Sequence, residues 1–366
     1  MRHLGKVVIL LILAINLFIT GLLLATAYSP YLQPTEHPVL SCIGLAFPVF
    51  LLLNVGFLLF WLLIQQYKCA LLSLAGLLLC WPQLQTYFPL HSRTDHLPEG
   101  SIKVLSYNIM GFGANLKRNE KNPILSYLAE SEADIICLQE YATRLTRHHP
   151  SQQEVERALA AWPYHRIDAV GSSRQNRIAC FSKLPILSAR PLEYASASNG
   201  TMLYELAWGK DTLLLINNHL ESNKLTKEDK VIYEDMLRDP EKEKVESGLR
   251  QLVKKLAEAS AIRAPQADSI AQAIARSTHR DIIVCGDFND SPISYAHRVI
   301  SQDLDDAFSQ SGRGFGISYN RNKFYFRIDN ILTSPSLKAY NCTVDRSLRT
   351  SDHYPIWCHV ARKEAL

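Results

Sequence analysis

Polar residues that could bind a cation or move a proton recur in this sequence directly after short apolar runs. The clearest case is residues 281–290, DIIVCGDFND, where the apolar run 282–285 is typical of a strand buried on both faces. Gly286 lets the chain turn, and Asp287, Asn289 and Asp290 follow at the strand end, where α/β sheets often carry functional groups. Alone, this pattern is equally typical of an ordinary strand-to-turn junction, because Gly, Asp and Asn are turn residues.

Other polar residues occupy the same position at the ends of other predicted strands. They are Asn108, Glu140, His219, Asp329, Asp352 and His353. Each alone is more often a surface or structural residue, but their recurrence at independent strand ends favours one shared site. Carboxylate and amide oxygens are ligands for a hard cation such as Mg²⁺, and a carboxylate or histidine can accept the proton of an attacking water. Hydrolysis of a phosphate ester requires this set of groups, since a cation stabilises charge on the phosphoryl group.

The elements that must position these residues are predicted from apolar periodicity. Besides 282–285, strands are expected at residues 102–109, 134–138, 177–182, 203–207, 212–216, 324–332 and 356–360, and helices at 122–131, 152–161 and 267–274. A polar loop is expected between residues 164 and 177. Residues 222–263 are highly charged and are interpreted as a helical insertion with a solvated face; a lid over the site is the alternative.

The first 90 residues differ in composition from the rest, because Arg2, Lys6, Glu36 and Lys68 are their only charged residues. Apolar blocks at 7–27 and 40–64 are each long enough to span a bilayer, which takes about 20 residues. A third block at 69–88 is weaker, because proline and glutamine interrupt its far end. A cleavable signal peptide is the alternative for the first block. We expect about three transmembrane helices in residues 1–90, a linker at 91–100 and a folded domain at 101–366.

The basic residues indicate how these helices would be oriented. Arg2 and Lys6 precede the first block and Lys68 lies between the second and third, whereas residues 28–39 contain no lysine or arginine. Because basic loops stay in the cytoplasm, three spans would place the C-terminal domain outside it, and two spans would place it inside. We expect an integral, multi-pass protein of a bacterial inner membrane with its C-terminal domain on the periplasmic side.

Charge and cysteine content narrow the function further. The net charge of +4 over 366 residues is not the signature of a polyanion-binding protein, which disfavours long duplex DNA as the main substrate. Most of the cysteines after residue 100 lie in apolar, strand-like runs, and no CxxC pair occurs among them. We therefore expect neither a disulfide framework nor a structural zinc site.

The strand-end residues belong to motifs that follow one another in a specific order: SYN, LQE, NHL, GDFN, RID and SDH. This ordered set resembles that of the endonuclease/exonuclease/phosphatase superfamily, which includes deoxyribonuclease I, abasic-site endonucleases, inositol polyphosphate 5-phosphatases and neutral sphingomyelinases. The resemblance covers residues 100–362; each motif is weak alone, whereas the ordered set is specific. It implies an α/β fold, a four-layer sandwich of two mixed β-sheets flanked by helices, with the site at one end.

The resemblance also implies roles for the strand-end residues. Glu140 would be the main ligand of Mg²⁺, for which Mn²⁺ could substitute, and Asn108 and Asp352 would be direct or water-mediated ligands. Asp287 would orient or deprotonate the attacking water, and Asn289 would hold the phosphate.

Two histidines complete the implied site. His353, paired with Asp329, would act as a base or as a transition-state stabiliser. His219 would bind the phosphoryl group or act as an acid, and the sequence leaves open which histidine does which. Asn218 and Arg177 are further candidates for phosphate contacts.

These expectations describe a membrane-anchored, Mg²⁺-dependent phosphoesterase that hydrolyses phosphodiesters or phosphomonoesters through a metal-activated water. The substrate would be a lipid head group, favoured by proximity to the membrane, or nucleic acid, which would make the chain an extracytoplasmic nuclease. A catalytically inactive binding module on a membrane stalk is the alternative from another class. Such a module would lack at least one of the groups above, and all are present. No protein partner is predicted.

Overall fold

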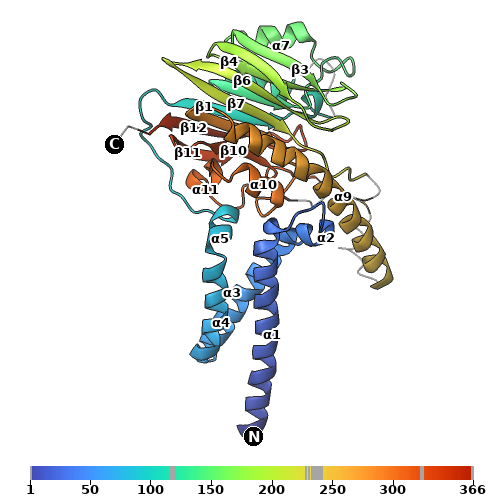
Figure 1. Ribbon diagram of the computed structural model, residues 1–366, viewed down its shortest axis with the longest axis vertical. Helices are drawn as coiled ribbons and strands as arrows, with labels where there is room; N and C mark the ends of the chain where they lie inside the picture. The colour runs from blue at the N-terminus through green and yellow to red at the C-terminus, as the bar shows by residue number, and fades with distance from the viewer. Residues whose placement is uncertain are drawn as a thin grey trace.

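The computed structural model describes residues 2–114, 121–226, 229, 231, 242–321 and 325–363. Helices of the N-terminal region form a stalk, and the rest of the chain forms an α/β domain at one end of it (Figure 1). The N-terminus lies at the free end of the stalk, whereas the C-terminus lies on the domain (Figure 1).

Apolar helices make up the stalk. α1 (Arg2–Tyr28) runs toward the domain, α3 (Phe47–Leu63) runs away from it, and α4 (Tyr67–Leu79) returns and is continued after a bend of 63° by α5 (Trp81–Tyr87) (Figure 1). By length and composition, Lys6–Tyr31 and Pro38–Leu63 can each cross a membrane, and the bent pair is a third candidate if it counts as one span. The structure therefore offers two or three spans, where the sequence predicts about three.

A buried polar network ties the three stalk helices together. Asn16 Oδ1 of α1 accepts hydrogen bonds from Trp61 Nε1 of α3 (2.8 Å) and from Ser73 Oγ of α4 (3.1 Å). Thr20 Oγ1 donates to Asn54 Oδ1 at 2.8 Å, again joining α1 to α3. Polar groups in an apolar bundle need partners, and interhelical hydrogen bonds of this kind hold such helices together. The network therefore fixes α4 beside α1 and α3.

Two six-stranded sheets pack face to face in the domain. The first has the order β11 (Leu337–Val344), β12 (Ile356–Arg362), β1 (Ile102–Asn108), β2 (Ile135–Gln139), β4 (Asn176–Ser182), β3 (Tyr164–Val170). The second has the order β5 (Ile186–Leu192), β6 (Gly200–Trp208), β7 (Asp211–His219), β8 (Asp281–Asp287), β10 (Asp329–Thr333), β9 (Asp305–Asp306).

Apolar side chains fill the space between the sheets and cover both outer faces. Val104, Leu215 and Ile283 belong to the core between the sheets. α6 (Pro123–Glu130) packs on the first sheet through Ile124 and Leu128. α7 (Gln152–Ala158) covers the same sheet, while α9 (Lys242–Ala275) and α10 (Tyr295–Ile300) cover the second (Figure 1). Both sheets contain parallel and antiparallel pairs. This is the four-layer sandwich of two mixed sheets that the family resemblance implies.

Strand directions bring the polar residues to one edge. β1 and β2 are parallel, as are β7 and β8, so their carboxyl ends lie together within each sheet. β12 and β10 run antiparallel to β1 and β8, so these two strands begin where the others end. Gly286 is required near the end of β8, because its φ is +128° and a Cβ there would lie 2.0 Å from the carbonyl oxygen of Asn218.

Several elements depart from the sequence expectations. β3 occupies part of the segment expected to be a polar loop, and β5 and β11 lie where no strand is predicted. β3 and β5 are mostly exposed or half-buried edge strands, so neither has a long apolar run. Regular pairing in β10 begins only at Asp329, and Phe324, the expected start, lies outside the described residues.

The long helix α9 also differs from expectation. It runs without interruption from Lys242 to Ala275 and includes Pro265, so the charged segment and the helix expected at 267–274 are one element. Its inner face packs on the second sheet through Ala267 and Ile270. Residues 227–228, 230 and 232–241 of the predicted insertion lie outside the described residues.

The stalk is docked on the domain by specific contacts. η1 (Ser29–Tyr31), α2 (Pro38–Ser41) and η2 (Cys42–Ala46) join α1 to α3 at the domain end of the stalk. Arg298 Nε donates to the carbonyl oxygen of Pro30 at 2.8 Å. A Cβ on Gly44 would lie 2.2 Å from the carbonyl oxygen of Ile293, so only glycine allows this approach. Arg327 Nη2 donates to the carbonyl oxygen of Thr86 at 2.9 Å.

A buried ion pair supports the last of these contacts. Arg327 Nη2 lies 2.9 Å from Asp306 Oδ2, and His297 Nε2 lies 3.2 Å from the same oxygen. The Phe308 amide donates to the other oxygen, Asp306 Oδ1, at 2.8 Å. Burial alone would raise the pKa of Asp306, but Arg327 and His297 hold it well below its ordinary value. Asp306 is therefore the counter-charge that keeps Arg327 in place.

Replacing Asp306 by asparagine should destabilise the protein, because Arg327 would be buried without its counter-charge. We expect Asp306→Asn to lower the free energy of unfolding by about 3 kcal/mol, measured by chemical denaturation of the full chain in detergent. The exposed Asp303→Asn should change it by less than about 0.5 kcal/mol.

The same ion pair predicts a pH dependence. Because the folded-state pKa of Asp306 lies below the unfolded value of about 3.9, its stabilisation is complete above that pH and is lost as the pH falls toward the folded pKa. Asp306→Asn should lack this part of the acid sensitivity. Equal stability of the Asp306→Asn and Asp303→Asn proteins would contradict the role given to the pair.

Candidate active site

The carboxyl ends of four strands deliver half of the site. Asn108 is the last residue of β1, and Glu140 directly follows β2. His219 and Asp287 are the last residues of β7 and β8 and are paired neighbours in the parallel ladder. The two sheets therefore contribute two of these side chains each.

Three further residues arrive from the opposite direction, whereas Asn289 follows β8 two residues after Asp287. Asp329 is the first residue of β10 and pairs with Asp287 in the antiparallel ladder. Asp352 and His353 lie in the turn before β12. Ser351 Oγ donates to the carbonyl oxygen of Asn108 at 2.8 Å, which fixes this turn to the end of β1.

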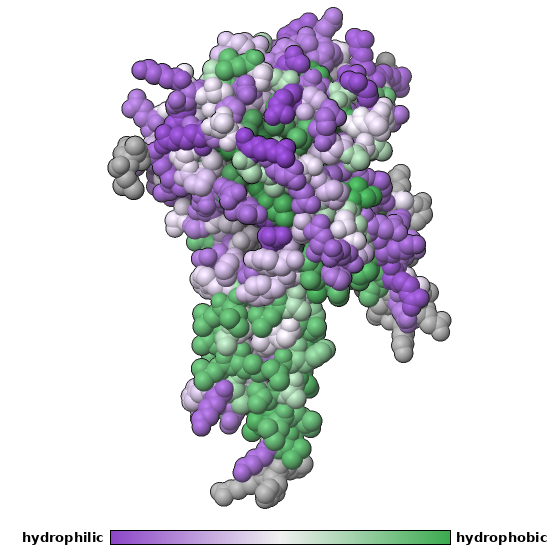
Figure 2. Space-filling model, viewed as in Figure 1, coloured by the Kyte–Doolittle hydropathy of each residue, from purple (hydrophilic) through white to green (hydrophobic). Residues whose placement is uncertain are grey.

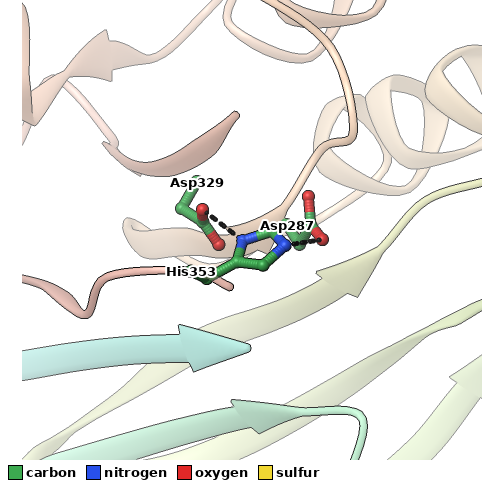
Figure 3. Close-up of side chains that lie close together, drawn as sticks. All are labelled: Asp287, Asp329 and His353. Carbon is green, nitrogen blue, oxygen red and sulfur yellow. Dashed lines mark hydrogen bonds and ion pairs between the residues drawn. The ribbon is translucent and has the colours of Figure 1, made fainter. Parts of the chain in front are cut away.

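A buried imidazole joins two buried carboxylates at the centre of the site (Figure 3). His353 Nδ1 lies 2.8 Å from Asp329 Oδ2, and His353 Nε2 lies 3.6 Å from Asp287 Oδ2. Burial alone would lower the pKa of His353, but the charges on Asp329 and Asp287 raise it well above its ordinary value. Burial raises the pKa of Asp287 to about 6. These three side chains therefore form one electrostatic unit.

Asn108 links this unit to Glu140. Its Nδ2 donates to Glu140 Oε1 at 3.2 Å and to Asp287 Oδ2 at 3.1 Å. Burial raises the pKa of Glu140, and the hydrogen bond from Asn108 opposes that shift. Glu140 itself is half-buried, with a φ of +52° that turns the chain at the end of β2.

His219 is buried beside Glu140 and Asp287 without forming a hydrogen bond to either of them. Its Nε2 lies 3.7 Å from Glu140 Oε1 and 3.8 Å from Asp287 Oδ2, beyond hydrogen-bond distance. Within the described part of the chain both of its buried ring nitrogens lack a hydrogen-bond partner. Buried polar atoms are normally paired, so these two nitrogens can still form hydrogen bonds that the described residues do not supply. Burial lowers the pKa of His219.

Hydrogen bonds from both the backbone amide and the side chain hold Asn289 in place. Its amide donates to Asp287 Oδ1 at 2.8 Å, and its Nδ2 donates to the carbonyl oxygen of Leu220 at 2.9 Å. Its φ of +52° is a conformation that asparagine tolerates better than most residues. These contacts fix Asn289 beside Asp287 in the cavity wall.

The site fits a divalent cation by its donor chemistry. Glu140, Asp287, Asp329 and Asp352 bring four carboxylates to one edge, and His353 is the buried base that pairs with two of them. Oxygen donors and excess negative charge are what Mg²⁺ and Mn²⁺ prefer. Ligand atoms of Asp287, Asp329 and His353 lie within 4.8 Å of one another, which makes this trio one candidate metal group. The family resemblance implies a different set, Glu140 with Asn108 and Asp352, in which Asn108 Nδ2 lies 3.2 Å from Glu140 Oε1.

A cavity of about 330 Å³ opens at these strand ends. Five of the residues predicted from sequence line it: Glu140, Asp287, Asn289, Asp352 and His353. Asn108, His219 and Asp329 lie in the layer behind, in contact with those residues. The eight predicted site residues are thus brought together.

The two weaker candidates for phosphate contacts are not in the cavity wall. Arg177 is exposed on β4, and Asn218 is buried in β7 with its Oδ1 accepting from Thr201 Oγ1 at 2.8 Å. Neither of them lines the cavity.

Arg263 of α9 is a residue that the sequence prediction missed. Its Nη2 lies 3.0 Å from Asp290 Oδ2, and its Nη1 donates to Asn223 Oδ1 at 2.9 Å. It lines the cavity and is 2 % exposed, so it is not part of the solvated charged face expected for residues 222–263. The sequence signal that could have found it is an arginine flanked by alanine and isoleucine on a helix that packs against a sheet.

Family models match both parts of the chain. Residues 8–87 match the model of a domain of unknown function, DUF8431. No curated protein matches the chain. Residues 105–353 match the model of the endonuclease/exonuclease/phosphatase family.

Solved structures share the fold of the domain. The chain is similar to a humanized D. rerio TDP2, with 15 % identity, a TM-score of 0.51 and coverage of 72 % of this chain and 100 % of that one. It is also similar to the human Nocturnin catalytic domain with bound sulfate anion, with 16 % identity, a TM-score of 0.51 and coverage of 75 % and 97 %. At these identities the likeness shows the fold alone. The family model matches more than half of the sequence, so the chain belongs to the endonuclease/exonuclease/phosphatase family.

Proposed function

We propose that the chain is a membrane-anchored, Mg²⁺-dependent phosphoesterase. By its family, the chain is a metal-dependent phosphoric ester hydrolase. One observation carries the proposal for this particular site: four carboxylates and two histidines converge at one sheet edge, where Glu140, Asp287, Asp352 and His353 line one cavity and Asp329 and His219 lie directly behind it. All the groups that the chemistry needs are present, which disfavours an inactive binding module.

We assign the cation to Glu140, with Asn108 and Asp352 as its direct or water-mediated partners, and with Mn²⁺ as a substitute for Mg²⁺. His353 already contacts both carboxylates of the Asp287–Asp329–His353 trio, through Nδ1 to Asp329 at 2.8 Å and through Nε2 to Asp287 at 3.6 Å, so a cation bound there would compete with the imidazole. Glu140 is half-buried at the cavity wall, where a hydrated cation has room. When bound, the cation would polarise the phosphoryl oxygens.

The remaining residues would position the substrate and move protons. Asp287 would accept a proton from the attacking water, because its carboxylate is buried and faces the cavity. Asp329 holds Nδ1 of His353, so Nε2 is directed at Asp287 and can bind a phosphoryl oxygen. His219 would contact the phosphoryl group or the leaving oxygen with a ring nitrogen, and Asn289 would hold the phosphate.

Removing the Glu140 carboxylate should remove metal-dependent turnover. We expect Glu140→Gln to weaken Mg²⁺ and Mn²⁺ binding and to lower bis-p-nitrophenyl phosphate hydrolysis by at least about 100-fold, measured by calorimetry and by release of p-nitrophenol. The exposed Glu132→Gln is the matched control and should retain both activities. Normal metal-dependent turnover in Glu140→Gln would reject the assignment.

Removing the Asp329 carboxylate should separate proton transfer from metal binding. Because Asp329 orients His353, we expect Asp329→Asn to lower kcat by about 100-fold or more. Mn²⁺ affinity should fall much less than in Glu140→Gln, because Asp329 contributes charge to this edge but no ligand atom to the assigned cation. The surface variant Asp303→Asn should change neither. A large loss of Mn²⁺ affinity would instead place the cation between Asp287, Asp329 and His353.

We further propose that the chain is multi-pass in a bacterial inner membrane, with the catalytic domain in the periplasm. Tyr28 Oη, at the end of α1, donates to the carbonyl oxygen of Leu79, at the end of α4, at 2.8 Å. This contact supports α4 crossing back to the level in the membrane at which α1 ends. The loop at residues 28–39, which has no lysine or arginine, contacts the domain through Pro30. Lys68 lies at the start of α4, away from the domain (Figure 1). The end of the stalk without basic residues is thus the one at the domain, and Lys68 lies at the opposite end. This arrangement agrees with basic residues staying on the cytoplasmic side of the membrane.

Protease protection tests this orientation. In spheroplasts that express the full chain, added proteinase K should degrade the domain while cytoplasmic marker proteins stay intact. Degradation only after the spheroplasts are lysed would place the domain in the cytoplasm. That result would mean that α4 and α5 do not cross the membrane.

A further inference from the structure

The cavity at the strand ends has one wall that the catalytic domain does not supply. Besides Glu140, Asp287 and His353, it is lined by Cys42 and Leu45 of η2. η2 belongs to the stretch Pro38–Leu63, which is long and apolar enough to cross a membrane. The candidate active site is therefore built jointly by the stalk and the domain.

Nonpolar side chains make up much of the rest of the cavity wall. They are Leu45, Leu225, Leu256, Phe326 and Ile328. Within the part of the chain that the structure describes, the lysine and arginine of the wall are Lys224 and Arg263, ion-paired with Glu221 and Asp290 respectively. A nucleic acid backbone would need free basic groups along its path. A hydrocarbon chain next to a phosphate ester would instead be stabilised by this nonpolar surface.

The docking of the stalk puts this cavity next to the membrane surface. Tyr28, Tyr31 and Trp81 are exposed at the domain end of the stalk helices, and exposed aromatic residues at helix ends mark the interface between membrane and water. Figure 2 shows hydrophobic surface over the stalk up to the underside of the domain. The tight approach of Gly44 to Ile293 fixes η2, and with it Leu45, at this level.

We propose that the substrate is a phosphate ester carried by a membrane lipid, with its polar head at the strand ends and its hydrocarbon chain against Leu45 of η2 and Leu256 of α9. This inference rests on the proposed function, because it names the substrate class of the same site. Hydrolysis adds one water across a P–O ester bond: the water oxygen bonds to phosphorus, and a proton ends on the leaving oxygen. Leu45 and Leu256 select the substrate by its apolar part.

Photo-crosslinking tests the binding step without metal or turnover. The metal-free full chain is reconstituted in vesicles of phosphatidylethanolamine and phosphatidylglycerol that contain a phosphatidylglycerol with a diazirine on its acyl chain near the head group. After illumination, mass spectrometry should find adducts on residues 42–46 and on the cavity face of α9 around Leu256. Adducts confined to the outer surfaces of α1, α3 and α4 would overturn the inference.

Turnover tests the selection of substrate. With Mg²⁺, the same vesicles should release a water-soluble product from phosphatidylglycerol, and the hydrolysis of bis-p-nitrophenyl phosphate and of a single-stranded oligonucleotide is measured in parallel. Leu45→Glu should lower the ratio of lipid to soluble-ester hydrolysis at least about tenfold. Leu256→Glu, on a different element, should do the same if Leu45→Glu fails to fold, as judged by circular dichroism. Leu249→Glu, an exposed α9 position outside the cavity wall, is the matched control.

The outcomes separate this inference from the proposed function. Metal-dependent cleavage of the soluble ester or the oligonucleotide, with the vesicle lipids intact, would overturn the lipid substrate and leave the phosphoesterase standing. An unchanged ratio in folded Leu45→Glu and Leu256→Glu would also overturn it. Absence of metal-dependent cleavage of any of these compounds would overturn both.

Discussion

Buried carboxylates are unfavourable unless a partner compensates their charge, and the site depends on this constraint. Asp287 and Asp329 are almost fully buried where β8 and β10 pair, and His353 reaches between them. The imidazole compensates part of that charge, but Glu140 and Asp352 add two further carboxylates nearby. The remaining negative charge explains why a divalent cation belongs at this edge of the sandwich.

The same constraint governs how the stalk and the domain are joined. Asn16 satisfies its polar groups within the stalk, and Asp306 compensates Arg327, which in turn bonds to the carbonyl oxygen of Thr86. Because these buried groups have fixed partners, η2 has a defined place against the domain. The stalk thereby contributes Leu45 to the cavity wall, so it takes part in the candidate site as well as supporting the domain.

Much of the site could be predicted from sequence because each polar residue directly follows or precedes a buried strand. An apolar run that ends in Asp287, or that begins after His353, predicts a strand and also places the polar side chain at the end of that strand. Edge strands β3 and β5 were missed because they are not buried enough to show apolar runs. Arg263 and Leu45 could not be assigned to the site from sequence. Their positions depend on how α9 and the stalk pack against the domain, and the residue pattern around each of them does not predict that packing.

The position of a bound divalent cation tests the central claim most directly. Crystals of the full chain would be soaked with Mn²⁺, and the ion would be located by its anomalous scattering. The account predicts an ion at about 2.0–2.6 Å from a carboxylate oxygen of Glu140, with Asn108 or Asp352 beside it and the Asp329–His353 hydrogen bond intact. An ion held by Asp329 and His353, with Glu140 free, would contradict the account, and so would the absence of an ion at this edge.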